Sequence, residues 1–305
     1  MSLKLTILGS SGALPAYGRF PSSQYLTIQN RHFLIDSGEG TQMRLAQFGI
    51  SIHKIDHIFI SHLHGDHYLG LTGLIFSMHL QKRESDLHLY AFRGLEEILL
   101  AQFRHSNSSL NYRIIFHRLS ENKAETIYED DALTVETIPL VHKINTSGFL
   151  FREKTKSLRM DKTKLGDEML LQHIVRLKAG EDIVDGSGNV LFRSKDYTLP
   201  PRPSFSYAYC SDTQPDPRIT ERIKKVDILY HEATFLEDEK EKARQTLHST
   251  AAEAAEVARQ AGVGKLLIGH FSARYKDLNP VLEEAKRVFE NTSLAIEGES
   301  FELKD

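Results

Sequence analysis

The sequence has one cysteine, no tryptophan and no apolar run long enough to cross a membrane. A single cysteine, Cys210, excludes an internal disulfide and fits a reducing compartment, so we expect a cytoplasmic protein with no membrane partner. The first residues lack the apolar stretch of a signal peptide. The chain also has no internal repeat at solenoid periods and no low-complexity tract, which argues against a repeat protein.

Neither sign of charge is in large excess. The 38 Lys and Arg residues against 41 Asp and Glu give a formal net charge of −3. This balance argues against a uniformly basic nucleic-acid-binding protein but not against a local basic patch. A hydrophobic fraction of 40% and a charged fraction of 26% are typical of a globular protein. The 305 residues suit one large two-sheet domain or two ordinary domains.

Apolar periodicity predicts an alternation of strands and helices along the chain. We expect a hairpin across Asn30 and a helix from Leu95 to Phe103 with Ile98 on its buried face. An Ala-rich helix should follow Ser249 and Thr250, either of which suits the N-cap. Further strands are expected at Leu3–Leu8, Leu133–Pro139, Phe205–Cys210, Val226–Tyr230 and Lys265–Ile268, and a last helix at Pro280–Phe289.

Three imidazoles and one carboxylate gather within six positions, at His62, His64, Asp66 and His67. They follow the strand-like run Ile55–Ile60 and precede an apolar helical stretch. Imidazole nitrogens and carboxylate oxygens are ligands of borderline cations such as Zn²⁺. On a helix His62 and His64 would point about 200° apart, so we expect a tight loop that directs all four side chains to one metal site.

Metal-competent residues recur where apolar strands end, at His62, His142, Asp212 and His270. Loops at strand ends converge in layered α/β proteins. Seven candidates are too many for one catalytic zinc, which uses three protein ligands and a water, but they suit two metals that share a carboxylate. Taken alone, His142 or His270 is more often an ordinary surface or core side chain, and Asp212 suits a turn cap. The set predicts His62, His64 and His142 on a first metal, Asp66, His67 and His270 on a second, and Asp212 as the bridge.

Two metals at such a site lower the pKa of a shared water and hold a phosphoryl oxygen. Asp66 could orient the hydroxide, and His248 is the candidate general acid, with Glu232 as its orienting partner. Cys210 has no obvious partner base and is expected to be a small buried hydrophobe. Seven other histidines have no such context and are predicted to be structural, namely His53, His57, His79, His88, His105, His117 and His173.

The composition becomes basic after Arg152. From there to Lys164 the sequence has six basic residues and two acidic ones. The segment extends to about Arg202, after which the apolar pattern of a buried strand begins again. We expect an insertion, 152–202, in a body made of residues 1–151 and 203–305. A charge run is often only a solvated face, and we give equal weight to a role in substrate binding. The candidate contacts are Lys154, Lys156, Arg159, Lys162 and Lys164.

Seven segments together resemble ribonuclease Z, the tRNA 3′-processing endonuclease family of the metallo-β-lactamase superfamily. They are Gly9–Pro15, Ile35–Gln42, Ser61–His67, Ser211–Thr213, His231–Thr234, His248–Ala251 and Gly269–Tyr275. The resemblance implies a layered α/β fold, an αββα sandwich with an inserted flexible arm, and two Zn²⁺ ions, with Mn²⁺ or another divalent ion as an alternative. It also implies a homodimer that cleaves precursor tRNA after the discriminator base and leaves a 3′-hydroxyl.

The resemblance also assigns roles to particular residues. The aspartate that matches Asp66 is the family's usual proton acceptor, and the histidine that matches His248 assists catalysis. Arg274 and Tyr275 belong to the segment beside the metal site, where an arginine could contact phosphate. The chain departs from the family at Leu165–Gln172, where a Gly-Pro motif is common, and at Gly18–Phe20, where an Arg-Asn pair is common.

Three other functions compete with this interpretation. The first is a small-substrate phosphodiesterase, for cyclic nucleotides or simple diesters, on the same metal site. The second is a redox di-iron protein, which is disfavoured because that branch has Glu where His64 stands. The third is a non-catalytic RNA-binding protein, which is disfavoured because no proposed ligand is missing.

Overall fold

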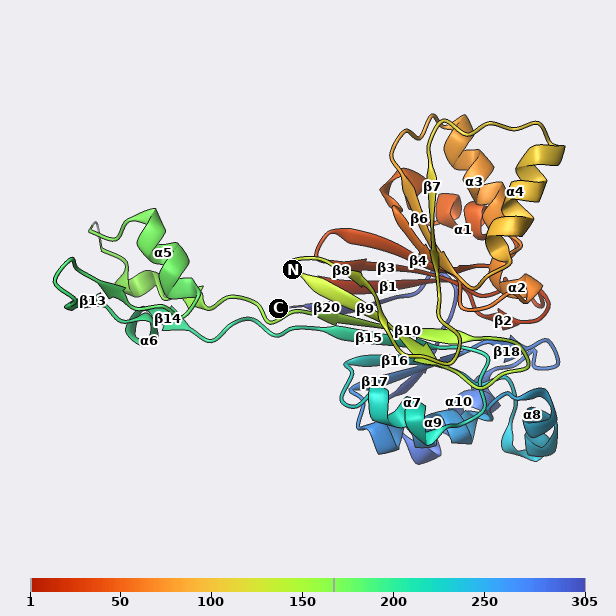
Figure 1. Cartoon of the computed structure of the whole chain (residues 1–305). Coiled ribbons are helices and arrows are strands. Elements are labelled where there is room, and N and C mark those ends of the chain that lie inside the picture. The colour runs from red at the N-terminus through yellow and green to blue at the C-terminus, as the bar shows by residue number, and fades with distance from the viewer. Residues whose placement is uncertain (1, 167, 305) are drawn as a thin grey trace.

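The computed structural model describes residues 2–166 and 168–304. Two seven-stranded sheets pack face to face, and helices cover both outer faces (Figure 1). The first sheet has the order β20-β1-β3-β4-β5-β6-β7 and the second the order β19-β17-β16-β15-β10-β9-β8. This is the αββα arrangement that the resemblance implies.

The elements of each half follow in chain order. The first sheet contains β1 (Ser2–Gly9), β3 (Ser23–Ile28), β4 (Arg31–Ser37), β5 (His57–Phe59), β6 (Leu87–Ala91), β7 (Ile114–Arg118) and β20 (Ser300–Lys304), beneath α1 (Thr41–Gln47), α3 (Leu71–Leu80) and α4 (Leu95–His105). The second contains β8 (Thr126–Glu129), β9 (Leu133–Pro139), β10 (Ser147–Glu153), β15 (Ser206–Cys210), β16 (Ile228–Glu232), β17 (Lys265–Gly269) and β19 (Thr292–Leu294), beneath α7 (Pro217–Arg222), α9 (Ala251–Ala261) and α10 (Asn279–Val288).

Strand alternation explains the layers. In β15, Tyr207 and Tyr209 face the first sheet, whereas Ala208 and Cys210 face the helices of the second half. Successive side chains of a strand point to opposite faces, so a strand with apolar residues at every position is buried on both sides. Cys210 is fully buried, as expected, and burial raises the pKa of its thiol.

Several predictions of local structure are confirmed. The hairpin turns at Gln29 and Asn30, both with the left-handed φ that a two-residue hairpin turn needs. Helix α9 begins after Thr250, whose hydroxyl accepts from Glu253 N–H in a capping box. The prediction for Ile98 is wrong, because this side chain is 41% exposed on α4. Strand β20, α7 and α8 (Lys240–Thr246) were not predicted from the apolar pattern, since all three are short or polar.

Residues 154–204 form a small lobe that extends away from the sandwich on two extended segments (Figure 1). The lobe contains β11 (Arg159–Met160), α5 (Leu171–Lys178), β12 (Ile183–Val184), β13 (Val190–Phe192), α6 (Ser194–Tyr197) and β14 (Thr198–Leu199). At its base the buried carboxylate of Glu153 accepts from Phe205 N and Gln29 Nε2, both at 2.8 Å. The atypical segment Leu165–Gln172 leads into α5, and its residue Asp167 lies outside the described residues.

No helix in residues 2–166 or 168–304 combines the length and the hydropathy that a membrane span requires.

Candidate metal centre

The HxHxDH segment does not form a single tight loop, so that expectation is wrong in part. His62 lies in irregular chain after β5, and His64 has an extended backbone as the N-cap of the next helix. Asp66 and His67 lie in the short helix α2 (Gly65–Tyr68). The change from extended to helical backbone at Gly65 directs both pairs to the same end of the sandwich.

The other three candidates reach this place from the ends of second-half strands. His142 follows β9, Asp212 follows β15 and His270 follows β17. Asp212 and His270 have φ values of 52° and 56°. Residues other than glycine seldom adopt this left-handed conformation, and it is concentrated at functional sites. A parallel pair between β2 (Ser11–Gly12) and β18 (Phe271–Ser272) connects the two halves beside them.

The first group of candidate ligands contains three histidines. His64 Nδ1 lies 3.1 Å from His62 Nε2 and 3.3 Å from His142 Nε2. Asp212 Oδ2 lies 3.6 Å from His62 Nε2 and 3.8 Å from His142 Nε2. These four ligand atoms lie within 4.8 Å of one another, a spacing that suits one metal ion.

The second group shares Asp212 with the first. Its other oxygen, Oδ1, lies 3.2 Å from both His67 Nε2 and His270 Nε2. Asp66 Oδ2 lies 3.4 Å from His67 Nε2 and 3.3 Å from His270 Nε2. The carboxylate of Asp212 therefore presents one oxygen to each group, as a bridging ligand would.

Hydrogen bonds fix which imidazole nitrogens face the centre. His67 Nδ1 bonds to Asp36 Oδ2 at 2.7 Å, and His142 Nδ1 bonds to Leu247 O at 3.2 Å. In the neutral form each Nδ1 is then the donor, so Nε2 carries a lone pair toward the carboxylates. Burial lowers the pKa of His62 well below its usual range, with His67 the next cause, and keeps this ring neutral. Burial works to lower the pKa of His67, but Asp212, Asp66 and Asp36 outweigh it and raise this pKa well above its usual range. The nitrogens that face the carboxylates therefore need a cation, either a proton or a metal ion, and the donor set fits divalent metals.

Asp36 is the main site residue that sequence reasoning missed. Its buried carboxylate accepts from Ser61 N at 2.7 Å, Ser61 Oγ at 2.8 Å and Tyr209 Oη at 2.6 Å, besides His67. It orients one candidate ligand and the start of the HxHxDH segment together. Its position at the end of an apolar strand, within a segment already noted for family resemblance, was the available signal.

His248 and Glu232 lie together as predicted, with 2.7 Å between Nδ1 and Oε1. Burial works to lower the pKa of His248, but Glu232 outweighs it and raises the pKa to about 9. Glu232 is the last residue of β16 and fully buried, so this strand extends two residues beyond its expected end at Tyr230. Thr234 Oγ1 lies 2.5 Å from Glu232 Oε2 and 2.9 Å from His270 Nδ1, which connects this pair to the candidate ligands.

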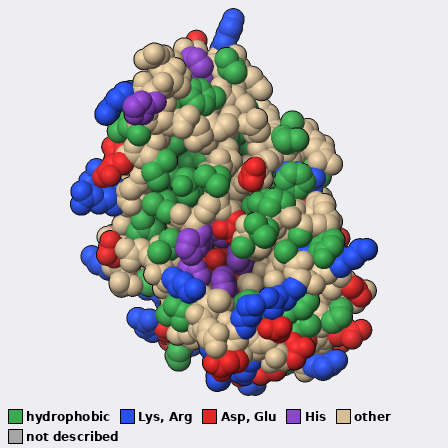
Figure 2. Space-filling model, turned by 90° about the vertical axis from the view of Figure 1, so that its right-hand side faces the viewer, with side chains coloured by type: hydrophobic (Ala, Val, Ile, Leu, Met, Phe, Trp, Pro, Cys, Tyr) green, Lys and Arg blue, Asp and Glu red, His purple; other side chains and the backbone are tan. Residues whose placement is uncertain are grey.

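The centre lies in an open hollow. Figure 2 shows histidine and acidic side chains at its base, apolar side chains above and Lys and Arg side chains along the lower border. His248 borders the centre, with ring centroids 5.0 Å from His142 and 5.5 Å from His270. The centre therefore opens to solvent on this face, although most of its ligand side chains are buried.

Arg274 and Tyr275 are held by protein contacts. Arg274 forms an ion pair with Glu239 at 3.0 Å and lies over the ring of Phe235, which neighbours His248. The Tyr275 hydroxyl accepts from Leu236 N at 3.1 Å, which is a structural contact.

The arm that carries the predicted basic contacts extends from the side of the sandwich opposite α2, β2 and β18 (Figure 1), and Lys154 and Lys156 lie at its base. Four of the five also form contacts within the protein. These are Lys154 with Glu129 at 2.6 Å, Lys156 with Glu153 at 2.9 Å, Arg159 with Pro200 O at 2.9 Å and Lys164 with Asp196 O at 2.7 Å.

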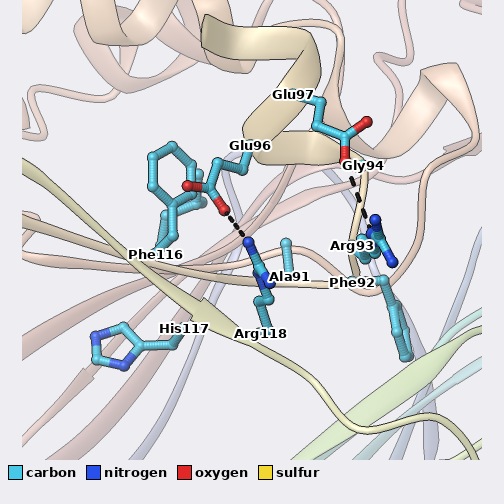
Figure 3. A pocket seen from close by; sticks show the side chains of 10 residues that line it. Ala91, Phe92, Arg93, Gly94, Glu96, Glu97, Phe116, His117 and Arg118 are labelled. Carbon is cyan, nitrogen blue, oxygen red and sulfur yellow. Dashed lines mark hydrogen bonds and ion pairs between the residues drawn. The ribbon is translucent and has the colours of Figure 1, made fainter.

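A separate small cavity lies between α4 and β6–β7. Two ion pairs, Arg118 with Glu96 and Arg93 with Glu97, lie at its edge (Figure 3). Its volume of about 20 Å³ holds roughly one water molecule, so no substrate fits there.

Fold and site together define a metallo-β-lactamase-type hydrolase. Its metal-competent side chains form two adjacent groups, and a third group, Asp212, His248 and His270, overlaps both. A family model described as "Anti-Pycsar protein Apyc1" matches residues 3–178. A ribonuclease Z of Cytophaga hutchinsonii is 45% identical over 100% of this chain and 97% of its own length, and one of Bacteroides fragilis is 43% identical over 97% of both. The chain belongs to the ribonuclease Z family, and over residues 3–178 to the group that the Apyc1 model describes.

Solved structures agree on the fold. The short form of human tRNase Z (ELAC1) superposes with a TM-score of 0.72 at 22% identity, covering 98% of both chains. The metallo-β-lactamase fold protein YhfI of Bacillus subtilis gives a TM-score of 0.69 at 19% identity, covering 99% of both chains.

Proposed function

We propose that the protein is a zinc-dependent endoribonuclease that cleaves precursor tRNA 3′ of the discriminator base and leaves a 3′-hydroxyl on the tRNA. The observation that carries the proposal is the seven-residue cluster with the His248–Glu232 pair beside it. Full-length identity to proteins named ribonuclease Z supports the substrate. A cytoplasmic location and a homodimer belong to the same proposal.

Two Zn²⁺ ions, held by the two groups that share Asp212, would supply an activated water and an electrophile for a phosphoryl oxygen. Asp66 accepts the proton of the attacking water. Its Oδ2 accepts from Ala13 N at 2.8 Å, which orients the carboxylate toward the cluster. Burial works to raise the pKa of Asp66, but His67 and His270 outweigh it and lower the pKa below its usual range, so Asp66 is ionised at neutral pH.

His248 supplies the other proton. Its Nδ1 is bonded to Glu232, so Nε2 is the nitrogen left to donate. As the water oxygen bonds to phosphorus, the bond from phosphorus to the tRNA 3′-oxygen breaks and this oxygen takes the proton of His248. The products are a tRNA with a 3′-hydroxyl and a trailer with a 5′-phosphate. Glu232 acts as a positioning residue that keeps His248 protonated.

We propose that residues 1–151 and 203–305 are the catalytic body and that the arm, 152–202, holds a distant part of the tRNA. Lys162 and neighbouring cations of the arm border a groove of about 800 Å³ that no carboxylate lines. Such a groove suits contacts to the phosphate backbone, which give affinity without reading sequence.

The direct test is cleavage of a precursor tRNA without CCA by the zinc-loaded protein, with the cut and both end groups mapped. Cleavage after the discriminator base with a 3′-hydroxyl on the tRNA is expected. No cleavage, or a cut with a 2′,3′-cyclic phosphate, would overturn the proposal, because a water-attack mechanism cannot leave that end group.

The second candidate function is hydrolysis of a small phosphodiester at the same centre. A solved structure of this fold is described as a diphosphatase, at 19% identity and a TM-score of 0.63. Replacing residues 155–200 by a short Gly-Ser linker distinguishes the two candidate functions. The body should stay folded in this variant, because Glu153 would still bond to Phe205 at the base of the arm. We expect loss of tRNA cleavage with retained hydrolysis of bis(p-nitrophenyl) phosphate. Unchanged tRNA turnover would contradict the role of the arm.

A further inference from the structure

The loop that carries the candidate ligand His142 also carries an exposed lysine, Lys143. This loop, residues 140–146, connects β9 to β10, and its residues 143–145 are exposed. Lys143 directly follows His142, so its backbone lies one peptide unit from a candidate ligand. Within residues 2–166 and 168–304, the Lys143 ammonium forms no ion pair or hydrogen bond.

The base of this loop is held firmly, although its tip is exposed. Val141 N donates to Thr213 Oγ1 at 3.1 Å, next to Asp212, and Leu140 N donates to Thr146 O at 3.1 Å. Ser147 N donates to Ser61 O at 3.0 Å, next to His62. Lys143 is therefore presented from a backbone whose position is set by the metal-centre loops themselves.

Two other cations near the centre, Arg274 and Arg19, are engaged by the protein. Arg274 is paired with Glu239, and the largely buried Arg19 donates to the carbonyl of Tyr275 at 2.7 Å. The hollow is nevertheless bordered by cationic side chains (Figure 2). Lys143 is exposed and follows a candidate ligand directly, so a flexible ammonium on this backbone suits a phosphate that neighbours the scissile one.

We propose that Lys143 binds an RNA phosphate adjacent to the scissile phosphate and so positions the polynucleotide across the metal centre. This inference deepens the proposed function and rests on it. A short diester has no neighbouring phosphate, so the contribution of Lys143 should depend on substrate length. A long RNA gains from the contact, and a minimal diester gains little.

The test compares the zinc-loaded wild type with Lys143→Ala, Lys143→Arg and the control Lys286→Ala. Lys286 is an exposed lysine in the last turn of α10 and, within the described chain, has no ion-pair partner. For precursor tRNA we expect Lys143→Ala to raise KM by about 5- to 10-fold with kcat changed less than twofold. The plot of log kcat/KM against log salt should become shallower by about 0.7 to 0.9. Lys143→Arg should restore KM, and Lys286→Ala should match the wild type.

The same proteins are assayed on bis(p-nitrophenyl) phosphate, with zinc content measured for each. A loss on the diester as large as on tRNA, or a loss of zinc, would overturn the proposal in favour of a structural role for Lys143. Equal KM values for Lys143→Ala and Lys286→Ala on tRNA would also overturn it while leaving the proposed function intact. A wild type that hydrolyses only the diester would overturn the RNA function and the role of Lys143 together.

Discussion

Two clusters of histidines in this protein differ in how their rings are oriented toward one another. In the first group of candidate metal ligands the three rings meet edge to face, with His62–His64 at 80°, His64–His142 at 83° and His62–His142 at 72° between planes. On the inner face of the first sheet, His57, His88 and His117 are stacked instead. Their centroids are 4.8 Å and 5.2 Å apart and their planes 25° and 20° apart.

The difference follows from where each cluster sits on the strands. His57 and His88 are register partners in neighbouring parallel strands, so regular pairing places one ring over the other. Figure 3 shows His117 pointing away from Glu96 and Arg118, on the side of β7 opposite α4. At the metal centre the histidines follow strand ends, where irregular backbone turns their nitrogens inward around two carboxylates. Histidine density alone does not define a metal site; converging lone pairs and an anionic oxygen do.

Asp212→Ala gives the largest expected effect in this comparison. It removes the one carboxylate that faces both groups, so zinc content should fall below one per chain. We expect kcat/KM to fall by at least about 10³-fold, which is more than the loss of a residue that only hydrogen-bonds to a ligand costs. His117→Gln, in the stacked cluster, is the matched control. Plasma mass spectrometry for zinc and tRNA cleavage check both variants. Full activity with normal zinc in Asp212→Ala would refute the shared bridge.

His248→Ala should slow turnover while the metal stays bound. Loss of a general acid costs about 10²- to 10³-fold in kcat. The Nδ1 of His248 is bonded to Glu232, so only Nε2 is left to face the centre. Single-turnover rates and zinc content are the two measurements. Zinc loss in this variant would make His248 a ligand and contradict the role of proton donor.

Asp36→Asn should weaken zinc binding by about 10- to 100-fold, because the carboxylate of Asp36 sets the orientation and basicity of the candidate ligand His67. The amide keeps the size of Asp36 but no longer accepts at both oxygens, so His67 and Ser61 lose a partner. Competition with a chromogenic chelator measures the affinity. An unchanged affinity would show that Asp36 serves folding alone.

The smallest expected effect is a pH dependence of stability from the stacked cluster. Burial lowers the pKa of His57 to about 4, with His88 adding to the effect and Asp56 and Asp130 opposing it. Because the unfolded pKa is about 6.5, protonation favours the unfolded chain. The free energy of unfolding should therefore fall as pH drops from 6.5 to 4, by about 2–3 kcal/mol.

His57→Phe tests this pH dependence because it keeps a ring against Phe33 and Tyr128 but removes the titrating nitrogen. Urea unfolding between pH 7 and pH 4.5 should show a smaller acid loss in this variant than in the wild type. His53→Phe, an exposed site on the short helix Ile52–Lys54, should follow the wild type. Identical slopes in all three proteins would contradict the assignment.

Much of the fold could be predicted from local sequence patterns, and the elements that were not predicted correctly have one cause in common. The hairpin at Asn30 and the cap at Thr250 depend on residues close in sequence, so propensity and side-chain chemistry sufficed. Strand β20 pairs with β1 from the other end of the chain, and its half-exposed polar sequence has no local signal. Ile98 lies at the expected helical spacing, but the face it occupies is left uncovered by neighbouring layers.

The sequence by itself predicted seven side chains as metal ligands, because the HxHxDH spacing and the residues after each strand limit the choice, and the structure brings all seven together with His248 beside them. Only the tertiary structure decided that Asp212 offers a separate oxygen to each group, that Asp36 orients His67, and that His57, His88 and His117 stack. Ring orientation and hydrogen-bond direction depend on neighbours brought from distant strands, and no local pattern encodes them.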